Sequence, residues 1–235
     1  MTNGETAANE ERLKRYWYNR WKEGFSWLDM AKTLRTSGHT IRDDFLAAQQ
    51  RFLQNLWETA KVSGEGYTLE IKGTIGISSY RDSKMDLYPM YMSQAGYALE
   101  NLFKGIIISG MWLNDPQSID VVDDFKTLRV PVKGSATQKM PLNIHDLNDL
   151  LAAKDMPLKF SDEERKVMRK LKDFILWGGR YPVPIEFDTG DPTYLRVMPP
   201  IDESNENEII EKIYRVAAAE LARLSNLQRD RRPED

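Results

Sequence analysis

The chain has 235 residues, of which 41% are hydrophobic and 29% are charged, and its formal net charge is −3. This length suffices for one large domain with a substantial core, and the small negative charge argues against a wide, uniformly basic nucleic-acid groove while allowing a local basic pocket. The absence of cysteine from the sequence excludes disulfides, a thiol nucleophile and cysteine-based metal sites, so we expect a reducing, cytoplasmic setting.

The first predicted elements are three helices. Residues 9–24 carry a helical pattern that ends near a glycine, and residues 26–38 form a second helix for which Gly38 is the predicted C-terminal stop. The pattern over residues 43–62 is clearer, because its phenylalanine, leucine and tryptophan side chains fall on one broad helical face.

The middle of the chain combines a strand signal with a long apolar helix. Residues 67–77 alternate apolar and polar positions with a period of two, which predicts one strand or a glycine-centred hairpin. Residues 87–113 are long enough to cross a bilayer, but Glu100 and Lys104 would then lie in hydrocarbon at a cost of several kcal/mol. Their i,i+4 spacing instead supports a helix in the interior of a bundle that does not enter the membrane.

Three more helices are predicted in the second half of the chain. Residues 143–155 form a short helix, and residues 161–179 form another that opens with a Ser161–Glu164 capping box. Two short extended pieces flank the turn sequence DTGDP, and a long helix over residues 204–228 follows. The pairs Glu208–Lys212 and Glu211–Arg215 are expected to support this helix, and its predicted apolar stripe consists of Ile210, Ile213, Ala217, Leu221 and Leu224.

These elements predict a mainly α protein, an up-and-down helical bundle with a small β-hairpin or extended additions. The expected organisation is a helical extension over residues 1–38, a bundle over residues 39–228 and a disordered tail over residues 229–235.

The central helix and the segments after it carry a recurring set of residues. They are Ala95, Ala98, Leu99, Glu100, Leu102, Lys104, Gly105 and Ile108, then His145, Asp146, Leu147, Leu150 and Leu151, and the WGGRYP sequence of residues 177–182. This set resembles HEPN-type domains over about residues 44–180. The central helix of that family reads roughly A-x-x-x-E-x-x-L-K-G/A-x-x-I, an H-D-L-x-x-L-L helix follows it, and some members have a GRYP turn.

The resemblance implies a helical bundle that is commonly a homodimer and acts in a prokaryotic antiviral defence or toxin–antitoxin system. The resemblance implies RNA or a nucleotide as a partner, and also a nucleotidyltransferase-like or other protein subunit. It implies no contact with a membrane. Active members are similar in being metal-independent endoribonucleases, so no cofactor and no metal are expected. They use an Arg-x(4–6)-His motif, in which histidine moves the proton of a ribose 2′-OH and arginine stabilises charge on the attacked phosphate.

This chain does not match that motif. Its two histidines are His39, which follows Arg35 with only three residues between, and His145, which is preceded at a comparable distance by Lys139. The sequence therefore leaves two functions open. One is an RNA-binding or RNA-cleaving protein, and the other is a non-catalytic interaction module that dimerises through its helices.

The candidate catalytic residues are His145 and Arg180. His145 either caps or packs at the start of a helix or serves as a proton-transfer residue, because histidine is suited to acid–base chemistry near neutral pH. Arg180 follows a glycine pair and either caps the preceding helix or forks onto a phosphate or carboxylate. His39 is expected in a surface turn after Gly38.

The candidate binding residues are Lys104, Trp17, Arg20 and Trp21. Lys104 either pairs with Glu100 or contacts a phosphate. The N-terminal stretch RLKRYWYNRWK alternates basic and aromatic residues, which could hold phosphates and stack on bases. The i,i+4 spacing of Trp17 and Trp21 also suits docking on a core or on a partner protein.

Overall fold

The structure is a computed structural model that describes residues 23–62, 87–115, 120–121, 128–129, 145–153, 156–178 and 204–231, and single positions between 12 and 22. Of the described residues, most are helical, which confirms the predicted mainly α class. The predicted strand over residues 67–77 and the extended pieces around DTGDP lie outside the described residues.

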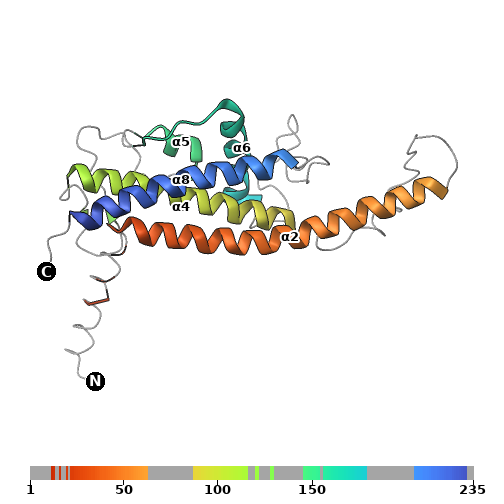
Figure 1. Ribbon diagram of the computed structural model, residues 1–235, viewed down its shortest axis with the longest axis horizontal. Coiled ribbons are helices and arrows are strands. Elements are labelled where there is room, and N and C mark those ends of the chain that lie inside the picture. Colours follow the sequence, from red (N-terminus) through yellow and green to blue (C-terminus); the bar gives the residue numbers. More distant parts are fainter. Residues whose placement is uncertain are drawn as a thin grey trace, which may run out of the picture.

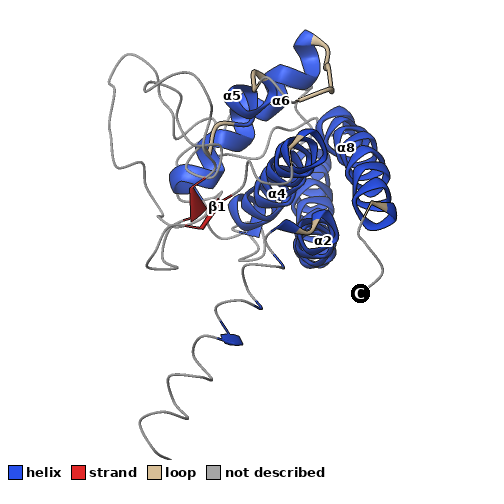
Figure 2. Ribbon diagram, turned by 90° about the vertical axis from the view of Figure 1, so that its left-hand side faces the viewer, coloured by secondary structure: helices blue, strands red, loops and turns tan. Residues whose placement is uncertain are grey.

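Helix α4 lies between two long helices on one side and a shorter helical layer on the other (Figures 1 and 2). The long helices are α2 (Gly24–Val62) and α8 (Ser204–Asp230), and α4 spans Tyr88–Asn114. The shorter layer contains α5 (Leu147–Leu151), α6 (Asp162–Asp173) and the π-helical turn η3 (Phe174–Gly178). One two-residue antiparallel pairing joins β1 (Asp120–Val121) to β2 (Leu128–Arg129).

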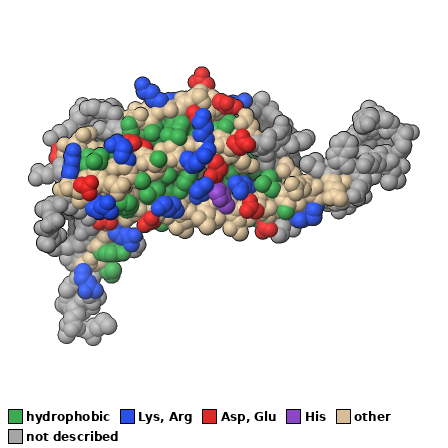
Figure 3. Space-filling model, in the orientation of Figure 1, with side chains coloured by type: hydrophobic (Ala, Val, Ile, Leu, Met, Phe, Trp, Pro, Cys, Tyr) green, Lys and Arg blue, Asp and Glu red, His purple; other side chains and the backbone are tan. Residues whose placement is uncertain are grey.

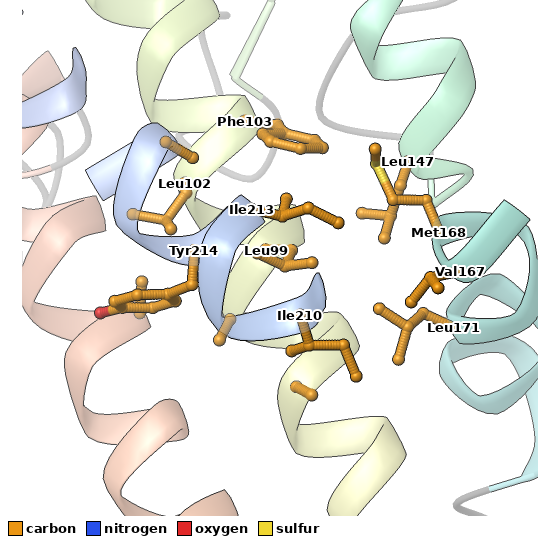
Figure 4. Packing of buried hydrophobic residues seen from close by; sticks show 14 of the residues in the cluster. Leu99, Leu102, Phe103, Leu147, Val167, Met168, Leu171, Ile210, Ile213 and Tyr214 are labelled. Atoms are coloured by element: carbon orange, nitrogen blue, oxygen red, sulfur yellow. The ribbon is translucent and has the colours of Figure 1, made fainter. Parts of the chain in front are cut away.

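Helix α4 is the core of the molecule, as the interior helix predicted over residues 87–113 requires. Its buried positions occupy every face rather than one stripe, which is the pattern of a helix packed on all sides. Figure 4 shows Leu99 and Phe103 of α4 close to Ile213 of α8, with the side chains of the α5–α6 layer opposite. Each fully buried side chain of this size contributes about 1.5–3 kcal/mol relative to leaving it in water.

Two glycines let the neighbouring helices approach α4 closely. A Cβ on Gly105 would lie 2.7 Å from Trp27 Cβ and 2.8 Å from Leu221 Cδ2. A Cβ on Gly96 would lie 2.6 Å from Ile175 Cγ1. Such distances are below van der Waals contact, so these positions are reserved for glycine by packing rather than by backbone conformation.

Helix α6 begins and ends with identifiable hydrogen bonds. The predicted capping box is confirmed, because Ser161 accepts from the backbone N–H of Glu164 while the Glu164 carboxylate accepts from the backbone N–H of Ser161. Burial alone would raise the pKa of Glu164, but these hydrogen bonds and Lys212 lower it below its usual value. At the other end, two backbone carbonyls of η3 accept hydrogen bonds from side chains of α4. Ser93 Oγ donates to the carbonyl of Phe174 at 3.1 Å, and the Tyr97 hydroxyl donates to the carbonyl of Ile175 at 3.1 Å.

The predicted break between helices at Gly38 is wrong. Helix α2 runs without interruption from Gly24, where the first predicted helix was expected to end, so the domain boundary predicted after residue 38 falls inside it. A glycine costs a helix about 1 kcal/mol relative to alanine, and packing offsets that cost here. The small residue lets α2 approach α4, since a Cβ on Gly38 would lie 3.3 Å from Gln94 Cβ.

Helix α8 has the predicted apolar stripe but not the predicted local ion pairs. The stripe residues Ile210, Ile213, Ala217, Leu221 and Leu224 are all buried. We expected Glu208 to pair with Lys212 and Glu211 with Arg215. Instead, Lys212 lies 3.0 Å from Glu164 of α6, and Glu211 binds residues of α2. Contacts with other helices therefore replace these two side-chain ion pairs within α8.

Among the helices described, none combines the length and apolar character needed to cross a membrane.

Gly105→Ala is expected to destabilise the fold despite the better helix propensity of alanine. Its Cβ would overlap Trp27 Cβ, which cannot rotate away, and overpacking of this kind costs about 1–3 kcal/mol. Gly38→Ala is the matched control, because its nearest side-chain contact is 3.3 Å. Urea denaturation should give a lower free energy of unfolding for Gly105→Ala than for Gly38→Ala. Equal free energies of unfolding would show that α4 is less tightly enclosed than described.

Candidate functional site

The candidate site is built on a buried ion pair within α4. Lys104 Nζ donates to Glu100 Oε1 at 2.6 Å across one helical turn, and the two side chains are 7% and 8% exposed. Charged groups at this depth lose much of their hydration, so the stability of each charge in the interior depends strongly on its partner. The pairing expected from the i,i+4 spacing is therefore present, and the charge of Lys104 is directed at Glu100.

His145 binds the same carboxylate oxygen from outside the helix. Its Nδ1 lies 3.1 Å from Glu100 Oε1, while its side chain is 49% exposed. A carboxylate can only accept a hydrogen bond, so Nδ1 carries the proton that is donated to Glu100. In the neutral ring this leaves Nε2 with the lone pair, which is the arrangement of a histidine that can accept a proton.

The neighbouring Asp146, rather than His145, caps helix α5. Asp146 Oδ1 accepts from the backbone N–H groups of Asn148 at 2.9 Å and Asp149 at 3.4 Å. Asp146 Oδ2 also lies 2.6 Å from Lys172 Nζ of α6. Burial would raise the pKa of Asp146, but Lys172 and the two backbone groups outweigh that effect and lower it. Asp146 thereby fixes the chain next to His145 between α4 and α6.

Two buried acceptor oxygens near these elements lack a hydrogen-bond partner within the described part of the chain. They are Glu100 Oε2 and Asn148 Oδ1. Buried polar atoms are nearly always satisfied in folded proteins. An unsatisfied carboxylate oxygen beside a half-exposed histidine marks this place as chemically unusual for a helical core.

Of the other predicted site residues, Arg20 is described and lies away from this cluster. Arg20 donates to the Tyr16 hydroxyl at 2.7 Å and to Ser26 Oγ at 3.3 Å, near the beginning of α2. Its guanidinium carbon lies 5.6 Å from the centre of the Tyr16 ring, and the hydrogen bond that Arg20 donates to Tyr16 raises the pKa of Arg20. Trp17, Trp21 and Arg180 lie outside the described residues, so their proposed roles stay predictions.

The sequence analysis missed a second histidine cluster. His39 is not in a surface turn but inside α2, where its Nε2 lies 2.7 Å from Glu211 Oε1 of α8. Arg35, one turn earlier on α2, also binds Glu211. The i,i+4 spacing of Arg35 and His39 was a usable signal, but their partner is more than 170 residues away along the chain.

Within the described residues, no group of three or more metal-ligating side chains could hold a metal ion. At the candidate site, His145 offers proton transfer and hydrogen bonding, supported by a carboxylate whose charge is balanced by Lys104.

Comparison with known proteins gives no match to a family model, to a curated protein or to a solved structure.

Lys104→Met is expected to destabilise the fold by about 3 kcal/mol, because it leaves the buried Glu100 carboxylate without its balancing charge. The matched control is the double variant Glu100→Gln/Lys104→Met, which removes both charges and keeps an acceptor for His145. Chemical denaturation should show that the double variant recovers much of the lost stability. If Lys104→Met unfolds at the same denaturant concentration as the wild type, the pair is not buried as described.

Proposed function

We propose that this chain is a HEPN-like helical protein of a prokaryotic defence or toxin–antitoxin type system, and that it binds RNA through the surface around His145. The observation that carries the proposal is the His145–Glu100 pair, in which a half-exposed imidazole is held through Nδ1 by a buried carboxylate. The resemblance of the central helix and of the His145–Leu151 segment to the family supplies the RNA substrate class.

The chemistry that this pair suits is proton abstraction from a ribose 2′-OH. His145 Nε2 takes the proton, and the 2′ oxygen attacks the adjacent phosphorus. The bond to the 5′ oxygen then breaks, leaving a 2′,3′-cyclic phosphate and a 5′ oxygen that takes a proton from water to become a hydroxyl. Glu100 stabilises the imidazolium formed in the first step, as a carboxylate behind a catalytic histidine does.

Stabilisation of the phosphate charge is assigned to Arg180 rather than Lys104. Lys104 is 7% exposed and bonded to Glu100, so a direct phosphate contact would require breaking a buried ion pair. Arg180 belongs to the WGGRYP turn of the resemblance and stays the proposed phosphate-binding residue.

A non-catalytic interaction module is the second candidate, favoured by exposed apolar side chains on the two long helices. Phe25 and Met30 of α2 and Val216 and Leu227 of α8 are each more than a third exposed. Apolar groups on helix surfaces are common contact points for a second copy or for a partner protein. In that case the His145–Glu100 pair would only fasten the segment before α5 onto α4.

Incubation of the full chain with tRNA, with and without a chelator, separates the two functions. The proposal predicts chelator-independent cleavage that falls by about 100-fold or more in His145→Gln, because general acid–base catalysis contributes about that much. His39→Gln is the matched control, since His39 is the other carboxylate-bound histidine and lies in a different cluster.

If His145→Gln cleaves tRNA at the wild-type rate, His145 takes no part in the reaction. Absence of cleavage by the wild type, with tRNA binding undetectable by fluorescence anisotropy, would favour the interaction module.

A further inference from the structure

Helix α6 carries a run of basic residues that begins after its first turn. The cations of this run are Arg165, Lys166, Arg169, Lys170 and Lys172. No acidic residue lies between positions 165 and 172 of the sequence. The acidic side chains of α6 lie instead at its last residue and in its first turn, where negative charge suits a helix N-terminus. This grouping differs from the face that carries α2 and α8, on which Figure 3 shows acidic and basic side chains interspersed.

Two of these cations are neutralised by carboxylates of neighbouring elements. Lys170 Nζ lies 2.7 Å from Glu206 Oε2 of α8, and Lys172 Nζ lies 2.6 Å from Asp146 Oδ2. The two ion pairs hold α6 against α8 on one side and against the chain that precedes α5 on the other. Their charges are therefore already used within the fold.

The other three cations, Arg165, Lys166 and Arg169, have no carboxylate partner within the described part of the chain. Lys166 and Arg169 are exposed and make no ion pair there. Arg165 is partly buried, and its Nε donates to the backbone carbonyl of Phe160 at 3.4 Å. A carbonyl satisfies the N–H group but does not balance the charge, so three positive charges remain unmatched over little more than one turn of helix.

The spacing of these three residues places like charges beside one another. Arg165 and Arg169 are four residues apart, and like charges at this spacing destabilise a helix. Opposite charges are available at the same spacing, Asp162 before Lys166 and Asp173 after Arg169, but neither pair makes an ion pair among the described residues. A bound anion would offset the repulsion, so the arrangement favours a negatively charged ligand.

Two contacts place this part of α6 beside the candidate site. Asn148 Nδ2 of α5 donates to the backbone carbonyl of Arg165 at 3.3 Å. One end of the basic run thus lies against α5, while the other end, at Lys172, binds Asp146, the residue after His145. Residues 165 to 172 span about 10 Å at the rise of an α-helix. The run therefore borders the segment that carries the half-exposed imidazole, and Figure 2 shows α5 and α6 as neighbours on the same side of α4.

We propose that Arg165, Lys166 and Arg169 form a phosphate-binding surface that holds the backbone of single-stranded RNA beside His145. This inference rests on the proposed function and names the part of the site that supplies affinity. Contacts from arginine and lysine to phosphates fix the position of a nucleic acid without reading its sequence. A single strand fits better than a duplex, because attack by a 2′ oxygen on the adjacent phosphorus needs a backbone that can turn. The surface holds neighbouring phosphates, whereas Arg180 stays the residue proposed for the attacked one.

Fluorescence anisotropy with a short labelled single-stranded RNA tests this surface in full-length His145→Gln, the parent chain. The test variant adds Arg165→Gln, Lys166→Gln and Arg169→Gln to that parent. Each phosphate contact to a single strand contributes about 0.7 to the slope of log affinity against log salt concentration, so the loss of three contacts should lower this slope by about 2. Between about 50 and 200 mM salt, the affinity of the parent should therefore fall about 20-fold more than that of the test variant.

The matched control adds Arg215→Gln, Arg223→Gln and Arg229→Gln to the same parent. It removes the same amount of positive charge from exposed positions of α8 and should keep the salt slope of the parent. An equal loss of slope in the control and the test variant would assign the effect to net charge and overturn the surface. A test variant that binds RNA like the parent would also overturn the surface, while RNA binding around His145 would stand.

The wild-type chain separates this surface from the proposed reaction. RNA binding that depends on the three α6 cations, without any cleavage, would support the surface and contradict the catalytic role of His145. RNA binding that is undetectable even at low salt would overturn the surface and the proposed function together.

Discussion

The carboxylate of Glu100 is the polar centre around which this helical protein is arranged. Helix α4 is enclosed by α2, α8 and the α5–α6 layer, so a charge on it loses most of its hydration and needs internal partners. Lys104 supplies the balancing charge from the same helix, and His145 supplies a second donor from the chain that precedes α5. The requirement to satisfy one buried carboxylate therefore links the core helix to His145, a half-exposed candidate residue.

The two histidines of the chain are bound to glutamates in similar ways but serve different parts of the molecule. His145 reaches inward to a carboxylate that is 8% exposed, whereas His39 reaches across to Glu211, which is 22% exposed and also held by Arg35. The first arrangement orients an imidazole toward solvent and suits proton transfer. The second connects two helices that are far apart in sequence.

Local signals in the sequence predicted the elements that local chemistry determines. The enclosed helix followed from an apolar run interrupted by one i,i+4 ion pair, the start of α6 followed from Ser161 and Glu164, and the buried face of α8 followed from its apolar spacing. Gly38 was misinterpreted because a glycine that ends a helix and a glycine that lets two helices approach look alike in sequence. The structure distinguishes them through the contact with Gln94.

Interactions between distant segments could not be predicted in this way. Arg215 lies four residues after Glu211, which made a pair within α8 the natural expectation. Arg35 of α2, which lies over the Tyr214 ring, is instead the partner of the Glu211 carboxylate. The π-helical turn after α6 likewise depends on Ser93 and Tyr97 of α4, which bind carbonyls of that turn. Such contacts depend on how the helices pack, and no spacing within one segment encodes them.

The protonation states of the two imidazole rings test the account most directly. Nitrogen-15 NMR of the full chain at neutral pH distinguishes the ring nitrogen that carries the proton in each histidine. The geometry predicts opposite tautomers, with the proton on Nδ1 in His145, which faces Glu100, and on Nε2 in His39, which faces Glu211. A spectrum in which His145 carries its proton on Nε2, unchanged in Glu100→Gln, would contradict the central claim that Glu100 holds and orients this histidine.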